Sequence, residues 1–311
     1  MYNGLTKKII RSLAEQKGEQ TLEKLNRLRL AVRNRLIACI VLFSVTGLLL
    51  WAKTDSFSVF ENSIIAGILL TWLAIRRPLE RFRAAYKYTF VMRALESQFT
   101  DVVYKSRTGI SRNTIADTQM MDLGTSFHSE DYIRARYGDI LFEQSDVLIQ
   151  QSAGKSTVTI FQGRWMIFDF NKHFRTNFQI VQKGFPNAKH RRFFGAENSL
   201  FKKISMESEA FNEEFRVYAQ NEHDAFYVIT PAFMERLQNL AARNKGKLLF
   251  CFVRNRLHIA IHDGKDSFEP GSVFEPIDAQ KAIRMACSEM GVVTRFINEL
   301  SLDNDLFLPT E

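Results

Sequence analysis

Two long apolar runs near the start of the chain constrain its fold more than any other feature. They cover Leu36 to Trp51 and Phe57 to Ile75, only residues 52–56 separate them, and Arg and Lys border both outer sides. A bilayer core about 30 Å thick is crossed by about 20 mostly apolar helical residues. The two runs therefore predict a transmembrane hairpin at residues 36–75.

The two runs differ in how strongly they predict a membrane span. The first is apolar on every face, whereas a surface helix of a soluble protein carries a polar stripe. Glu61 and Asn62 interrupt the second run near its start, and a carboxylate at the bilayer centre costs about 3 kcal/mol. We therefore expect Glu61 at the outer interface. A re-entrant second segment and a pair of buried core helices are the alternatives.

The distribution of basic residues predicts the orientation of this hairpin. Residues 1–35 contain nine Lys or Arg and three Glu, and residues 76–93 contain six Lys or Arg and one Glu. Lys53 is the only base in the connecting loop. By the positive-inside rule, both termini are cytoplasmic, which predicts a multi-pass protein of the cytoplasmic (inner) membrane. The long basic lead, with no small-x-small cleavage site after the first run, favours a retained anchor over a signal peptide.

The net charge of +8 is unevenly distributed along the chain. Residues 1–93 carry +10 and residues 94–311 carry −2. Clustered cations beside a membrane segment are explained by attraction to anionic lipid. A pI near 9.4 is therefore poor support for nucleic-acid binding. Three cysteines without paired spacing match a reducing compartment.

Hydrophobic periodicity predicts helices on both sides of the hairpin. Apolar residues recur every three or four positions from Leu22 to Val32 and from Leu79 to Phe90. Pro78 suits the first turn of the second of these helices. We expect a basic amphipathic helix at 1–35, the hairpin at 36–75, a stalk helix at 76–100 and a cytosolic domain at 101–311.

The C-terminal part is dominated by strand patterns, with helices late in the chain. Residues 106–129 are polar and predict an irregular connection. Thr230 and Pro231 predict a helix start, and a closing helix is expected over 277–300. Short aromatic and β-branched runs predict strands at 139–151, 157–161, 164–170, 178–182, 201–206, 215–218, 226–229, 248–253 and 257–262. The expected class is α+β with a mostly antiparallel sheet.

No segment carries a complete catalytic, cofactor or metal motif. Residues 153–157 imitate the end of a P-loop, but Ile149 occupies the first glycine position and a strand pattern follows. His258 and His262 are separated by about 13 Å along a strand, too far to share one zinc ion. Asp169 ends an apolar strand, where a carboxylate more often caps a turn than acts in catalysis. We therefore assign no catalytic residue, no cofactor and no metal.

A basic and aromatic segment is the candidate binding surface. Cations interleaved with phenylalanines suit phosphate-bearing partners, and in a membrane-tethered protein anionic lipid is the nearest one. A solvated charged loop over an aromatic core explains the same pattern. The candidate residues are Lys183, Lys189, Arg191, Arg192, Lys202 and Lys203.

Phe161 to Lys172, which contains the run Trp165-Met166-Ile167-Phe168-Asp169-Phe170, resembles the bacterial family of unknown function DUF3137. Asp131 to Ile133, Tyr137-Gly138 and Tyr227 to Met234 also match its pattern. The resemblance covers residues 101–268 and implies two N-terminal membrane helices before a cytosolic domain. It implies no catalytic or ligand residue. Some relatives are encoded beside LemA-type membrane proteins, which implies such a protein as a partner.

Three functional hypotheses follow from these patterns. The leading one is a membrane-anchored cytosolic binding or regulatory module, with the lipid bilayer as its first partner and self-association compatible with the sequence. The second is recognition of anionic lipid by the basic segment. The third is a membrane-bound hydrolase that uses Asp169 or the histidines.

Overall fold

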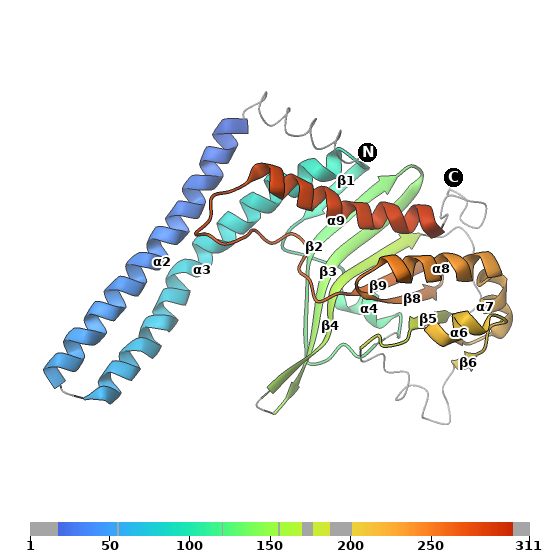
Figure 1. The fold of residues 1–311 in the computed structure, drawn as a ribbon, viewed down its shortest axis with the longest axis horizontal. Helices are drawn as coiled ribbons and strands as arrows, with labels where there is room; N and C mark the ends of the chain where they lie inside the picture. Colours follow the sequence, from blue (N-terminus) through green and yellow to red (C-terminus); the bar gives the residue numbers. More distant parts are fainter. Residues whose placement is uncertain are drawn as a thin grey trace. The chain divides into compact units, whose positions relative to one another are not determined.

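The computed structural model describes residues 18–54, 56–119, 121–154, 156–169, 177–186 and 201–300. Two compact units divide the chain, and each is described by itself. One comprises residues 1–97 and 268–287, and the other comprises residues 98–267 and 288–311. Helix α9 (Ala279–Leu300) contributes its first part to one unit and its second part to the other (Figure 1).

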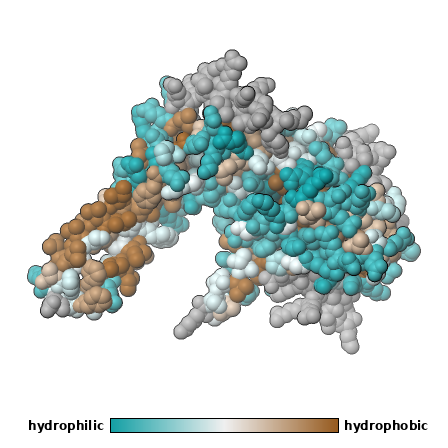
Figure 2. All heavy atoms as spheres, in the orientation of Figure 1, coloured by the Kyte–Doolittle hydropathy of each residue, from teal (hydrophilic) through white to brown (hydrophobic). Residues whose placement is uncertain are grey.

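The first unit is built on two long antiparallel helices, α2 (Gly18–Thr54) and α3 (Phe57–Glu96). Each apolar run continues into its flanking helix without a break, so Pro78 lies inside α3 and not in a first helical turn. Both helices are long and apolar enough to cross a membrane, and only 6% of the most apolar window of each is buried. Figure 2 shows the apolar surface that results. This exposure indicates association with a membrane.

The flanking parts of α2 and α3 bury the predicted stripes. Leu25, Phe82 and Phe90 are each almost fully buried. Leu25, Phe90 and Ala94 form one apolar cluster with Ile283 and neighbouring residues of α9. The helix pair therefore has a packed core beyond its apolar runs, as the spacing of Leu22 to Val32 and Leu79 to Phe90 predicts.

The second unit is organised around an antiparallel sheet, which confirms the α+β class. Among the described residues the sheet has nine strands in the order β1-β2-β3-β4-β9-β8-β5-β7-β6. The strands are β1 (Thr100–Lys105), β2 (Ser126–Tyr137), β3 (Ile140–Ala153), β4 (Ser156–Asp169), β5 (Phe178–Gln182), β6 (Lys202–Ile204), β7 (Phe215–Ala219), β8 (Lys247–Val253) and β9 (Arg256–His262).

Each face of this sheet has an apolar cover. On one face, Trp165, Cys251 and Ala260 pack with residues from the segment 110–123, which contains the short helix α4 (Arg112–Ala116). On the other face, Phe252 and Phe250 of β8 contact Phe233 and Phe296. The helices that follow β6 are α6 (Glu209–Glu214), α7 (Glu222–Val228) and α8 (Pro231–Arg243), and Thr230 caps α8 as predicted.

The structure corrects three of the predicted elements. Residues 226–229 belong mostly to helix α7 and not to a strand, because Asn221 caps the helix and acidic residues occupy its first turn. The segment 106–129 contains α4 and the start of β2, and is therefore not wholly irregular. The predicted strands at 157–161 and 164–170 form one strand, β4.

Gly163 explains how β4 continues through a position that the sequence suggests as a break. Its φ is +150°, and a Cβ atom there would lie 2.1 Å from the carbonyl oxygen of Ile261 on β9. Glycine is therefore required for the close approach of these two strands.

Candidate functional site: a pocket in the membrane-proximal stalk

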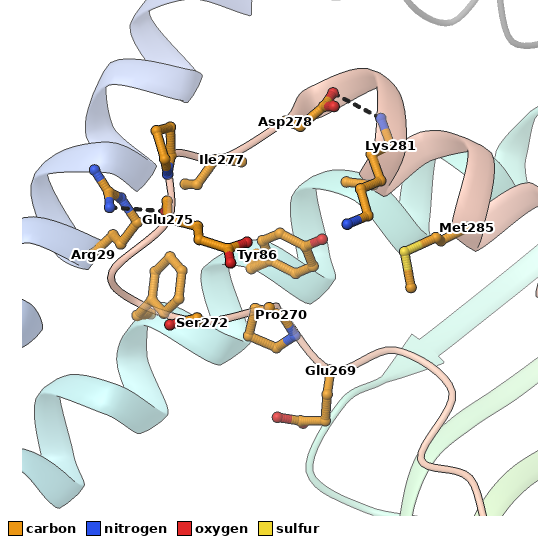
Figure 3. Close-up of a pocket in the computed structure, with 14 residues that line it drawn as sticks. Arg29, Tyr86, Glu269, Pro270, Ser272, Glu275, Ile277, Asp278, Lys281 and Met285 are labelled. Carbon is orange, nitrogen blue, oxygen red and sulfur yellow. Dashed lines mark hydrogen bonds between the residues drawn. The ribbon is translucent and has the colours of Figure 1, made fainter.

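A pocket of about 390 Å³ lies in the first unit, beyond the apolar runs of α2 and α3. This volume falls within the range of small-molecule sites, about 300–1,000 Å³. We call it the stalk pocket (Figure 3). Its lining comes from α2, α3, the loop 269–278 and the first turns of α9, and comprises Arg29, Phe82, Tyr86, Glu269, Pro270, Gly271, Ser272, Glu275, Pro276, Ile277, Asp278, Lys281, Ala282 and Met285.

Arg29 fixes the loop that forms one wall of the pocket. Its guanidinium donates hydrogen bonds to the carbonyl oxygens of Val273 at 3.0 Å and Glu275 at 2.8 Å. Its Nε donates to Asn26 Oδ1 at 2.9 Å. Arg29 is only 5% exposed. These charge-assisted hydrogen bonds therefore replace the hydrogen bonds to water that the guanidinium loses on burial. Arg29, on the helical stretch from Leu22 to Val32, is therefore a positioning residue for the loop.

A second ionic contact holds the start of the same loop. Glu269 accepts from Lys87 Nζ at 2.9 Å and from Arg83 Nε at 3.0 Å. The Lys87 side chain is 3% exposed, and removing the partner of such a buried charge costs about 3–5 kcal/mol. The loop is thus tied to α2 by Arg29 and to α3 by Glu269.

The N-terminus of α9 forms a further wall of the pocket. Asp278 accepts a hydrogen bond from the backbone nitrogen of Lys281 at 2.9 Å, as an N-cap carboxylate does. Figure 3 shows the Glu275 and Lys281 side chains on opposite sides of the pocket, with the Tyr86 ring between them. A mostly apolar wall with a few converging charged groups can bind an amphiphile and orient its polar end.

The second unit contains a buried ionic network around Arg164 of β4. The guanidinium donates to Ser267 Oγ at 2.9 Å and to the Glu289 carbonyl oxygen at 3.1 Å, and it also pairs with the Glu289 carboxylate. Asp146 accepts from the Ser267 backbone nitrogen at 2.7 Å. Burial raises the pKa of Asp146 to about 6, and Arg164 opposes that rise. Ser267 and Glu289 flank the segment 268–287, so one guanidinium holds both of its ends.

Two acidic residues of β2 and one from the loop after β9 form the arrangement in the described residues that could hold a cation. One oxygen of each of Glu130, Asp131 and Asp266 lies within 4.8 Å of the others. Tyr104 donates to Asp131 at 2.6 Å, and burial together with Asp131 raises the pKa of the Tyr104 hydroxyl.

Asp169, His258 and His262 have different partners in the structure. Asp169 ends β4 and pairs with Arg256 at 3.0 Å. His258 lies opposite Ile167, where its Nδ1 accepts from Trp165 Nε1 at 3.2 Å. Burial lowers the pKa of His258 to about 3, so the imidazole is neutral. His258 and His262 lie on one strand, as predicted, and Cys251 is buried with a raised thiol pKa.

The predicted basic surface is described only in part. Lys183, Lys202 and Lys203 are exposed, the last two on the edge strand β6. Phe185 and Phe201 are buried in the sheet core rather than presented beside these cations. Lys189, Arg191 and Arg192 lie outside the described residues. A lipid-binding role for the six residues stays a prediction.

Sequence reasoning did not find the stalk pocket, because its loop comes from a distant part of the chain. The local signal was present: Glu269-Pro270 and Glu275-Pro276 mark a loop, and Asp278 is a cap before a helical stripe. The sequence does not indicate that this loop contacts Arg29, which lies more than two hundred residues away.

Comparison with known proteins supports the resemblance that the strand motif suggested. The family model described as "Protein of unknown function (DUF3137)" matches residues 159–302. Residues 159–302 carry the DUF3137 signature. The match includes the loop 269–278 and α9, and it begins after β3.

One solved structure and no curated sequence matched significantly. That structure is the crystal structure of the mycobacterial trehalose monomycolate transport factor A, TtfA. It is 9% identical, has a TM-score of 0.33, and the alignment covers 70% of this chain and 93% of that chain.

Proposed function

We propose that this DUF3137 chain is a multi-pass protein of the bacterial cytoplasmic membrane, with both termini in the cytoplasm, that works as a membrane-anchored binding or regulatory module. One observation carries the proposal: two exposed apolar helices continue into a packed stalk that holds a pocket. The orientation is supported by the basic residues on both cytoplasmic flanks and by the single base, Lys53, in the loop. A LemA-type protein and a second copy of the chain are proposed partners.

Membrane retention tests the anchor. Leu42 and Ile68 are 58% and 66% exposed near the middle of the two apolar runs. Replacing both with Lys adds about 3 kcal/mol of insertion cost per helix, so we expect Leu42→Lys/Ile68→Lys to be lost from the carbonate-washed membrane fraction. Tyr88→Lys is the matched control, because Tyr88 is 68% exposed on α3 beyond the apolar run. Equal retention of the double variant and the control would contradict the anchor.

A second candidate function is recognition of anionic lipid, favoured by the exposure of Lys183, Lys202 and Lys203. Each cation near an anionic surface contributes about 1 kcal/mol, so replacing all three with Gln should lower the ratio of docked to undocked domain about a hundred-fold. The measurement is quenching of a fluorophore at Glu207→Cys by headgroup-labelled lipid in anionic proteoliposomes.

The matched control for that experiment changes three exposed lysines elsewhere on the sheet unit, Lys105, Lys245 and Lys265, to Gln. Quenching should fall when Lys183, Lys202 and Lys203 are replaced and when the salt concentration is high, and it should persist in the control. The same quenching in neutral and anionic membranes would argue against lipid recognition by this surface.

A further inference from the structure

The charges in the stalk pocket divide into those already engaged and those that face the cavity. Arg29 is engaged by two carbonyl oxygens, and Glu269 is engaged by Lys87 and Arg83. Among the described residues, no ion pair or hydrogen bond engages the side chains of Glu275 and Lys281. Asp278 is engaged by the backbone nitrogen of Lys281. The pocket therefore offers one carboxylate, Glu275, and one ammonium group, Lys281, to a ligand.

The lining of the pocket offers different surroundings to the two ends of a zwitterion. Phe82 and Tyr86 lie side by side, with ring centroids 6.2 Å apart. Aromatic faces beside carboxylates favour an ammonium group. The Lys281 ammonium, a compact point charge, suits a phosphate. Figure 3 shows Glu275 and Lys281 on opposite sides of the Tyr86 ring, so the carboxylate and the ammonium group line different parts of one pocket.

The position of the pocket along the helices indicates where such a ligand comes from. Arg29 lies seven residues before the first apolar run, and Phe82 lies seven residues after the second. At 1.5 Å per residue this is about 10 Å of helix beyond the hydrocarbon core. The headgroup region adds about 5–8 Å to each side of that core. The pocket thus borders the headgroup layer.

We infer that the stalk pocket binds a zwitterionic phospho-amine headgroup, of the phosphoethanolamine type, that belongs to a lipid of the adjacent leaflet. The amine is held by Glu275 and the phosphate by Lys281, so that the glycerol end lies on the Met285 side of the pocket (Figure 3). This inference rests on the proposed membrane anchor and adds the ligand class to it.

The test uses the full chain in maltoside micelles, titrated with phosphatidylethanolamine, phosphatidylglycerol or free phosphoethanolamine, with bound lipid read by native mass spectrometry. We expect phosphatidylethanolamine to bind at least about ten-fold more tightly than phosphatidylglycerol, which lacks the amine. Glu275→Gln and Lys281→Met should each weaken that binding about ten-fold. Glu80→Gln on α3 and Lys24→Met on α2, both exposed and outside the pocket, should not weaken it.

The outcomes separate the parts of the inference. Equal affinity for the two lipids, or unchanged binding in both pocket variants, would overturn the assignment. Equally tight binding of free phosphoethanolamine would overturn a lipid as its source. Because neither replaced side chain has a partner in the part of the chain that the structure describes, both variants should keep the wild-type melting temperature. If the chain is not retained in carbonate-washed membranes, the proposed anchor is wrong. If the chain is retained but does not prefer phosphatidylethanolamine, only this inference is wrong.

Discussion

At the scale of single residues, His258 shows how burial sets the charge of a group that sequence alone leaves open. The imidazole is 3% exposed, it accepts a hydrogen bond from Trp165, and burial followed by the nearby Arg256 lowers its pKa to about 3. The folded state therefore excludes the proton that the unfolded chain takes up near the usual pKa of 6.5. The stabilising contribution of a neutral His258 is present above pH 6.5 and is lost progressively as the pH falls toward 3.

This linkage predicts a pH dependence that one substitution removes. Between pH 7 and pH 5, His258 should lower the free energy of unfolding by about 2 kcal/mol, while Asp146, with its raised pKa, acts in the opposite direction. In His258→Gln, a side-chain carbonyl can still accept from Trp165, so the acid loss of stability should shrink by about that amount. Denaturant unfolding at both pH values measures it, and parallel pH profiles for the two proteins would refute the linkage.

At the scale of elements, periodicity predicts those parts of the fold in which local pattern and tertiary packing agree. The hairpin of β8 and β9, the helix start at Thr230 and the buried stripes of α2 and α3 follow directly from spacing. β1 and β2 were missed because their exposed sides carry charged residues such as Asp101 and Arg134, which dilute the strand signal. α7 was mistaken for a strand because Phe226 and Tyr227, both strand formers, are exposed on a capped helix.

The stalk pocket could not be predicted in the same way, because it joins segments that are far apart in the chain. The two halves of the apolar stripe of α9 belong to different units. Ile283 and Cys287 pack with Leu25 and Phe90, whereas Met290 and Val293 belong to the sheet unit. A helical repeat in sequence indicates that a stripe is buried but not what covers each part of it.

Gly163 provides a test of how β4 and β9 pair. Gly163→Ala adds a Cβ atom 2.1 Å from the Ile261 carbonyl oxygen at a φ that alanine rarely adopts. We expect a loss of about 3 kcal/mol in the free energy of unfolding. Gly271→Ala is the control, since its added Cβ meets nothing within 4 Å, and its stability should stay close to wild type. Similar unfolding midpoints for the two variants would contradict the close approach of β4 and β9 at Gly163.

At the scale of the whole molecule, the chain consists of two compact units, neither of them continuous in sequence. Residues 268–287 belong with the N-terminal helices, while Ser267 and Glu289, just outside this segment, are both held by Arg164 in the sheet unit. The predicted boundaries at residues 35, 75 and 100 stay predictions. No linear signal in the sequence indicates that a late segment returns to the stalk, because hydropathy and charge patterns report each position only with its neighbours.

Thiol labelling in intact cells tests the membrane hairpin most directly. In a Cys39→Ala background, with Cys251 and Cys287 buried, a cysteine at Ser56 lies between the two apolar helices and one at Glu207 lies exposed in the sheet unit. The proposed topology predicts that an impermeant maleimide labels Ser56→Cys in intact cells and labels Glu207→Cys only after the cells are opened. Labelling of Glu207→Cys in intact cells, with Ser56→Cys protected, would contradict the proposed orientation.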